Sequence, residues 1–134
     1  MRTMRSVQCL IAAAIVAAYG VARVEAHHSI AMFDGGRTVK ITGIVQGFRW
    51  INPHVSIEID AVGEGDTPGR WIVEMTAPNV LMGEGWKRDS VAVGDLITIF
   101  AHPLRNPAAA TDGSHRGLYV GVTLPDGKTL GRVD

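Results

Sequence analysis

The sequence predicts an all-β fold, a small OB-like barrel of five to six strands with one short helix after strand three. Five stretches of strand length carry alternating or continuous apolar residues, and turns rich in Gly, Pro, Asn and Asp separate them. Between the third and fourth stretch, residues 78–82 start with proline and are followed by glycine, which is typical of one or two helical turns. Three strands, a helix and two strands are the order of an OB-type barrel.

The expected strands cover residues 38–48, 54–62, 70–75, 95–101 and 118–124, with a short sixth strand at 129–133. The second alternates most cleanly, with Val55, Ile57 and Ile59 on one face. The alternation of the first slips near Gly43, and an internal glycine in a strand marks a bulge or a barrel bend. A β-sandwich is the alternative, but five or six strands are few for a sandwich, and closure of a barrel removes unpaired sheet edges.

The amino-terminal segment resembles a secretory signal. Arg2 and Arg5 precede an apolar run at residues 7–18, and residues 24–26 fit the small-x-small cleavage pattern loosely. We therefore expect a signal peptide at residues 1–26 and a mature protein in the periplasm or secreted, with no membrane segment after cleavage. An uncleaved anchor is the alternative, although the run is shorter than the about 20 residues of a membrane span.

Cleavage changes both the thiol content and the charge. Cys9 is the only cysteine and lies within the signal, so the mature chain has no disulfide. The whole chain has 13 basic and 13 acidic residues, and three of these arginines and one glutamate precede residue 27, which leaves 10 basic and 12 acidic residues. A chain with this slight acidic excess is not expected to bind nucleic acid. Residues 27–37 form an N-terminal arm, and residues 38–134 form the OB-like β-barrel domain.

Five histidines are the candidate metal ligands, and none lies in the middle of an expected strand. His27 and His28 begin the mature chain, where an α-amino nitrogen and ring nitrogens can chelate one metal ion. His54 follows the loop between strands one and two, and His102 and His115 flank the loop between strands four and five. In an OB-like barrel these two loops flank the ligand face, so we expect the three loop histidines near one end of the barrel, within reach of the arm.

A nitrogen-rich site without thiolate suits Cu(II), Ni(II) or Zn(II), and the affinity order favours Cu(II). The predicted ligands are His27, His28, His54 and His102. The alternative is that each loop histidine is a turn residue whose ring N–H bonds a backbone carbonyl. In a pocket-binding interpretation, Trp50, Trp86 and His115 would line a pocket for a small molecule or a glycan, although packing in the core is the more ordinary role for the tryptophans.

Short motifs run along almost the whole mature chain. They are Ala26-His27-His28-Ser29 with Phe33-Asp34, Trp50-Ile51-Asn52-Pro53-His54, Pro78-Asn79-Val80-Leu81 with Gly85-Trp86, Gly94-Asp95, His102-Pro103-Leu104-Arg105 and Leu124-Pro125-Asp126-Gly127. In these motifs the chain resembles an uncharacterised bacterial family of exported small β domains. The resemblance implies export and a small β domain, and it implies no activity. His115 has no counterpart in the pattern, so it ranks behind the other four as a ligand.

The expected function is that of an exported, periplasmic metal-binding protein, with copper as the expected cofactor. The alternatives are a barrel that binds a small molecule, a glycan or a periplasmic partner protein, and an accessory subunit of a periplasmic oxidoreductase. No Ser/His/Asp set or carboxylate pair has a spacing that predicts catalysis, so a binding protein is favoured over an enzyme.

Overall fold

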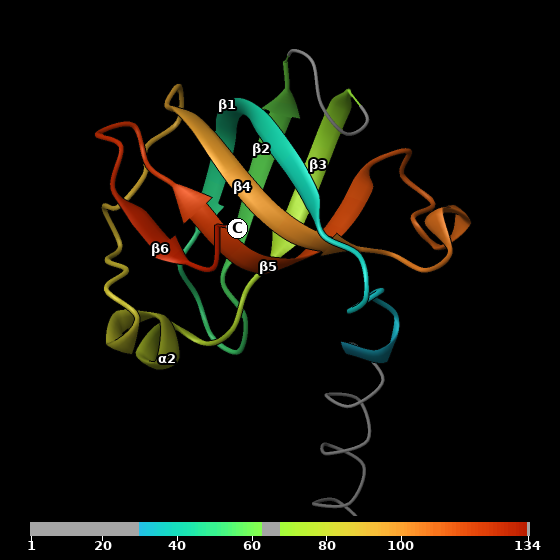
Figure 1. Cartoon of the computed structure of the whole chain (residues 1–134), viewed down its shortest axis with the longest axis horizontal. Helices are drawn as coiled ribbons and strands as arrows, with labels where there is room; N and C mark the ends of the chain where they lie inside the picture. The colour runs from blue at the N-terminus through green and yellow to red at the C-terminus, as the bar shows by residue number, and fades with distance from the viewer. Residues whose placement is uncertain (1–29, 63–67, 134) are drawn as a thin grey trace, which may run out of the picture. The chain divides into compact units, whose positions relative to one another are not determined.

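The computed structural model describes residues 30–62 and 68–133, and the compact unit that starts at Phe33 is an all-β barrel. Its elements are β1 (Val39–Arg49), β2 (Ser56–Ala61), β3 (Gly69–Glu74), α2 (Pro78–Gly83), β4 (Leu96–Pro103), the 3₁₀ turn η1 (Pro107–Ala109), β5 (His115–Thr123) and β6 (Thr129–Gly131). Figure 1 shows these strands wound around one another, with β6 at the edge.

The strands close into a barrel of five, with β6 as an additional sixth strand. The order β3-β2-β1-β4-β5-β6 is closed by a pairing between β3 and β5. That pairing is parallel and aligns Trp71 with His115, whereas every other pairing is antiparallel. This is the order of an OB-like barrel, so the predicted fold class is confirmed, including the single short helix after strand three.

Alternating side chains fill the barrel. The inward-facing residues are almost completely buried, and they are Val39, Ile41, Val45, Ile57, Ile59, Trp71, Val73, Ile97, Ile99, Ala101 and Val122. Such β-branched and aromatic side chains favour strands because they pack well on a pleated surface. The interior is therefore a packed core, and a ligand must bind at an end or on the outside of the barrel.

β1 bends where the sequence predicted an irregularity. Gly43 faces inward, and a Cβ at this position would overlap the backbone of Asp60 on β2. The register with β2 shifts slightly later, between Val45 and Gly47. The missing side chain therefore allows the close approach of two strands, and the adjacent bulge lets β1 pair with both β2 and β4.

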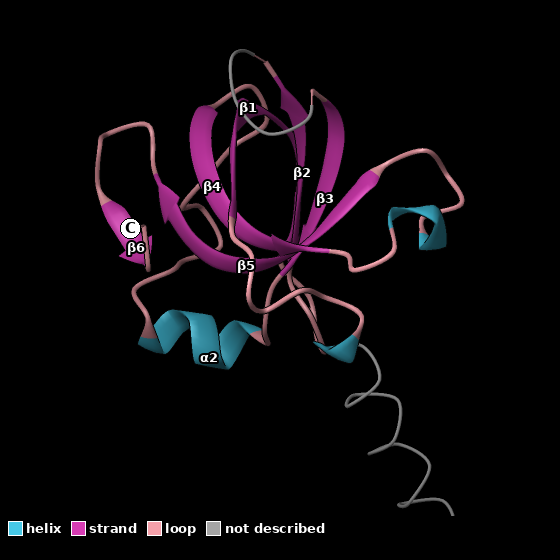
Figure 2. Cartoon of the chain, turned by 45° about the vertical axis from the view of Figure 1, so that its right-hand side comes forward, coloured by secondary structure: helices cyan, strands magenta, loops and turns pink. Residues whose placement is uncertain are grey.

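α2 lies at the end of the barrel where β1 ends and β2 begins (Figure 2). Pro78 occupies its first turn, where a missing N–H costs nothing, and Leu81 is its buried residue. The backbone N–H of Trp86 donates to the carbonyl of Leu81, which directs the Trp86 side chain into the core. The helix and the following loop thus close this end of the barrel with apolar side chains.

Two strands extend further than the sequence predicted. β4 runs to Pro103, and β5 begins at His115 instead of Leu118, so the loop between them covers residues 104–114. The additional β5 residues are held by pairing with β3, where Arg116 lies opposite Ile72. This pairing is distant in sequence, so the local alternation of residues 115–118 does not reveal it.

Candidate functional site

The five candidate histidines fall into three groups. His27 and His28 lie outside the described residues, as does the expected signal peptide. His54 lies before β2, and His102 and His115 lie at the end of β4 and the start of β5. The structure therefore places three of the five.

His54 is held by a carboxylate. Its Nδ1 lies 2.7 Å from Oε1 of Glu74, and the His54 side chain is 44% exposed. A carboxylate accepts hydrogen bonds, so Nδ1 carries the proton and Nε2 keeps its lone pair in the neutral ring. Histidines that bind metals commonly donate their second ring N–H to a carboxylate in this way. His54 is therefore a possible single ligand.

His102 has the same arrangement with a different acceptor. Its Nδ1 lies 2.7 Å from the backbone carbonyl oxygen of Arg37. A carbonyl oxygen can only accept, so Nδ1 is the donor and Nε2 of the neutral ring keeps its lone pair. Arg37 belongs to the arm, and the arm continues along the end of β4, where the N–H of Asp34 donates to the carbonyl of Pro103 at 2.8 Å. His102 thus lies where the arm is attached to the barrel.

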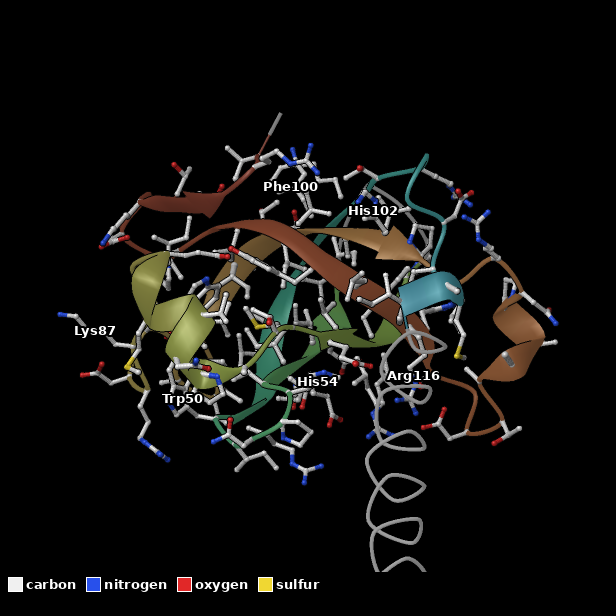
Figure 3. The ribbon with its side chains drawn as sticks, turned by 90° about the horizontal axis from the view of Figure 1, so that it is seen from below. Trp50, His54, Lys87, Phe100, His102 and Arg116 are labelled. Carbon is white, nitrogen blue, oxygen red and sulfur yellow. The ribbon has the colours of Figure 1, made fainter. Side chains whose placement is uncertain are left out.

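Only two of the three loop histidines lie at one end of the barrel: His102 lies at the end of β4, where β5 begins at His115, and the prediction is wrong for His54. His54 precedes Ser56, which pairs with Arg49 at the end of β1, whereas His102 follows Ala101, which pairs with Val39 at its start. Figure 3 shows His54 and His102 on different parts of the barrel. Within residues 30–62 and 68–133, no three His, Cys, Asp or Glu side chains are grouped closely enough to hold a metal ion.

His115 lies against Trp71 in a small pocket. The ring centroids are 5.0 Å apart, with the planes inclined by 34°. The pocket opens at the end of the barrel where β3 and β5 begin and β4 ends, and its volume is about 80 Å³. Arg37, Leu104 and Arg116 are among the other residues that line it. His115 is therefore a pocket residue, and Trp71 is a lining residue that was not predicted.

A hydrogen-bonded network shapes one wall of this pocket. Ser114 Oγ donates to Asp112 Oδ1 at 2.6 Å, and Arg116 donates to both residues, from Nε to Ser114 Oγ and from Nη2 to Asp112 Oδ2 at 2.9 Å. Hydrogen bonds from Ser114, and then the charge of Arg116, lower the pKa of Asp112 to about 2. The network keeps Arg116 in place and compensates its charge.

Trp50 and Trp86 lie in the core near α2 and are not among the residues that line this pocket. Phe48 lies between them, with ring centroids 5.6 Å from Trp50 and 5.9 Å from Trp86. Nε1 of Trp86 donates to the hydroxyl oxygen of Tyr119 at 3.1 Å, and burial raises the pKa of Tyr119 to about 12. Both tryptophans therefore pack in the core, which is the more ordinary of the two roles that their sequence positions allow.

The outer face of β2 and β3 is charged. Arg70 pairs there with Glu58, with 2.6 Å between Nε and Oε1, and Asp60 and Glu74 are on the same face. Single-stranded nucleic acids bind OB barrels through aromatic side chains and a positively charged groove. Neither is found on the described part of this face, where three carboxylates accompany one arginine.

A family model matches residues 14–116, and its description is "Family of unknown function (DUF6152)". The chain belongs to this family. The DUF6152 match covers the motifs from Ala26 to Arg105 and ends before the Leu124-Pro125-Asp126-Gly127 turn. No curated protein and no solved structure matches the chain. Membership in DUF6152 therefore adds no activity, and function has to be inferred from the residues.

Within the described residues, no helix is long and apolar enough to cross a membrane.

Three residues of the His115 pocket were not predicted as site residues: Arg37, Trp71 and Arg116. Trp71 was assigned to the core, and it is 97% buried, yet the edge of its ring borders the pocket. Alignment of β3 with β5 would have revealed the site, because this parallel pairing brings Trp71 beside His115. The signal was the OB-type order itself, in which the third and fifth strands are neighbours.

Proposed function

We propose that this protein is exported and binds one metal ion, with Cu(II) as the preferred metal, through His27, His28 and His102. The observation that carries the proposal is the 2.7 Å hydrogen bond from His102 Nδ1 to the carbonyl oxygen of Arg37. It joins His102 to the chain segment that leads back to His27 and His28.

The attachment point of the arm favours His102 over His54 as the third histidine, because the arm is paired with the barrel close to His102. Phe33 forms a β-bridge with Leu104, two residues after His102. His28 is five residues before Phe33, so its Cα is within about 18 Å of the Phe33 Cα in any conformation. His54 is bonded to Glu74, and the strand that carries Leu118 lies between Glu74 and His102, so two strand spacings, roughly 10 Å, separate the Glu74 and His102 backbones. A site that includes His27 and His28 is thus compatible with His102, and His54 remains a separate single ligand.

The donor set explains the preference for copper. Cleavage after Ala26 would give His27 an α-amino group that chelates together with its own ring nitrogen. His28 adds a third nitrogen, and Nε2 of His102 adds a fourth. Four nitrogen donors without thiolate suit a tetragonal Cu(II) site, and the affinity order of divalent metals places Cu(II) above Ni(II) and Zn(II). The carbonyl of Arg37 fixes the tautomer of His102 in the way that outer partners of metal-binding histidines do.

The test is a Cu(II) titration of the exported protein, monitored by calorimetry, with three variants. His102→Ala removes a proposed ligand, and one extra residue before His27 removes the amine from the chelate. Both are expected to weaken binding by about tenfold or more, because each removes one metal–nitrogen bond. His54→Ala is the matched control, since His54 has the same fixed tautomer on a different part of the barrel, and its affinity should equal that of the unchanged protein. Equal affinity in all four proteins would exclude the proposed site.

A further inference from the structure

The pocket beside Trp71 has a chemical character that metal binding does not explain. Its lining includes the apolar residues Val39, Trp71 and Leu104 and the polar residues Arg37, His115 and Arg116. Two arginines but no carboxylate are among its lining residues. A pocket whose lining combines apolar and cationic side chains suits a ligand with both an apolar part and a negative charge.

The two arginines have different roles. Arg116 is neutralised by Asp112 and fixed by Ser114, and the Ser114 side chain is buried at 5% exposure. Its position is therefore set without a ligand. The Arg37 side chain is exposed, and its guanidinium forms no ion pair or hydrogen bond with the described residues. A guanidinium presents a planar pair of donors that matches the two oxygens of a carboxylate.

The pocket volume limits the size of the ligand. A cavity of 150 Å³ accommodates benzene, whereas this pocket has about 80 Å³ and one open side. It can enclose an apolar group of only a few carbon atoms, and a larger group must extend through the opening. Trp71 and Leu104 contribute the apolar border for such a group, although only 3% of Trp71 is exposed.

We propose that this pocket binds a small monocarboxylate with a short apolar tail. The carboxylate pairs with the guanidinium of Arg37, and the tail lies against Trp71 and Leu104. His115 lies against Trp71 at the edge of the pocket, and Arg116, whose charge Asp112 compensates, lines it in a fixed position. The inference is independent of copper binding, because the metal site would use the backbone carbonyl of Arg37 and this site uses its side chain.

The experiment is an NMR titration of the exported protein without metal, in which the Trp71 indole and His115 ring resonances are monitored. The probes are acetate, propionate, butyrate and benzoate at constant ionic strength, with sulfate and butyramide as controls. We expect millimolar affinity, as is usual for ligands of this size. Butyrate should bind more tightly than acetate because its tail buries additional apolar surface. Sulfate lacks the tail and butyramide lacks the charge, so both should bind at least about tenfold more weakly than butyrate.

Two exposed arginines on the same stretch of chain provide the matched variants. Arg37→Gln removes the charge but keeps the backbone carbonyl, and it should weaken butyrate binding by about tenfold or more. Arg49→Gln changes an exposed arginine at the far end of β1 and should leave the affinity unchanged. Equal binding of butyrate by both variants, equal binding of sulfate and butyrate, or no shift with any carboxylate would overturn the proposal.

Discussion

Nδ1 of His102 donates to the carbonyl oxygen of Arg37 at 2.7 Å. This hydrogen bond joins the second-to-last residue of β4 to the arm that precedes β1. The hydrogen bond fixes the ring and leaves Nε2 available. It also connects two features that are far apart in the sequence, the histidine of the His102-Pro103-Leu104-Arg105 motif and the arm that follows His27 and His28.

His102→Ala should reduce stability only slightly. The ring is half-buried and the substitution removes one hydrogen bond, so the free energy of unfolding should fall by about 1 kcal/mol. Urea denaturation followed by circular dichroism measures this difference. A loss of more than about 3 kcal/mol would show that His102 has a mainly structural role.

Gly43→Ala should destabilise the barrel because the new Cβ would overlap the Asp60 backbone. The expected cost is about 1–3 kcal/mol, as for other overpacked cores. Gly47→Ala is the control on the same strand, since its Cβ would meet only Glu58 Cβ at an ordinary 3.8 Å. Its effect should be neutral or slightly stabilising. Similar losses in both variants would mean that β1 and β2 are not as close at Gly43 as described.

Tyr119→Phe should cost about 1–3 kcal/mol of stability. The change removes the hydroxyl that accepts from Trp86 Nε1, and Trp86 is 1% exposed, so a buried N–H loses its partner. Ser90→Ala, which removes an exposed turn acceptor for the N–H of Lys87, should cost much less. The comparison uses urea unfolding at neutral pH. Equal costs would indicate that water reaches the indole of Trp86.

Tyr119 should ionise late in alkaline solution. Its folded pKa of about 12 is above the ordinary value of 10.0, because burial disfavours the phenolate. This contribution to stability is fully present below pH 10 and is lost as the pH rises through about 12. Tyr19 precedes residue 27, so the ultraviolet absorbance of tyrosinate in a protein that begins at His27 reports on Tyr119 alone. Ionisation near pH 10 in the folded protein would contradict the described burial.

Asp112→Asn should lower stability at neutral pH but not in strong acid. The pKa of Asp112 is lowered from 3.8 to about 2, so its contribution is present above pH 3.8 and is lost as the pH falls through about 2. The difference between the two proteins in urea midpoint should therefore shrink over this range. A difference that stays constant down to pH 2 would mean that the loss comes from packing and not from the carboxylate charge.

The fold class was predictable because local sequence patterns indicate the strands and the short helix and their order along the chain. The alternation at Val55, Ile57 and Ile59 and the proline-initiated turn at residue 78 gave strands and a helix in an order that few all-β folds share. The bend at Gly43 was also predictable, because a glycine inside a strand pattern often marks a bulge, a bend or a close approach of another backbone.

The arrangement of the candidate site was less predictable because it depends on register. The loops that carry His54 and His102 flank the same OB-type face but lie at different ends of β1. The start of β5 at His115 depends on pairing with Trp71, 44 positions earlier in the chain. Pairing between residues so far apart in the sequence is set by barrel closure, and the alternation of apolar and polar residues within one strand does not indicate it.

The most direct test of copper binding is metal analysis of the protein purified from the periplasm after growth with copper, together with its intact mass. The proposal predicts a mass that begins at His27 and about one copper per chain. It also predicts loss of that copper when one residue is inserted before His27, with retention in His54→Ala. A chain that begins at His27 but carries no copper, or one that keeps its copper when the amino terminus is extended, would contradict it.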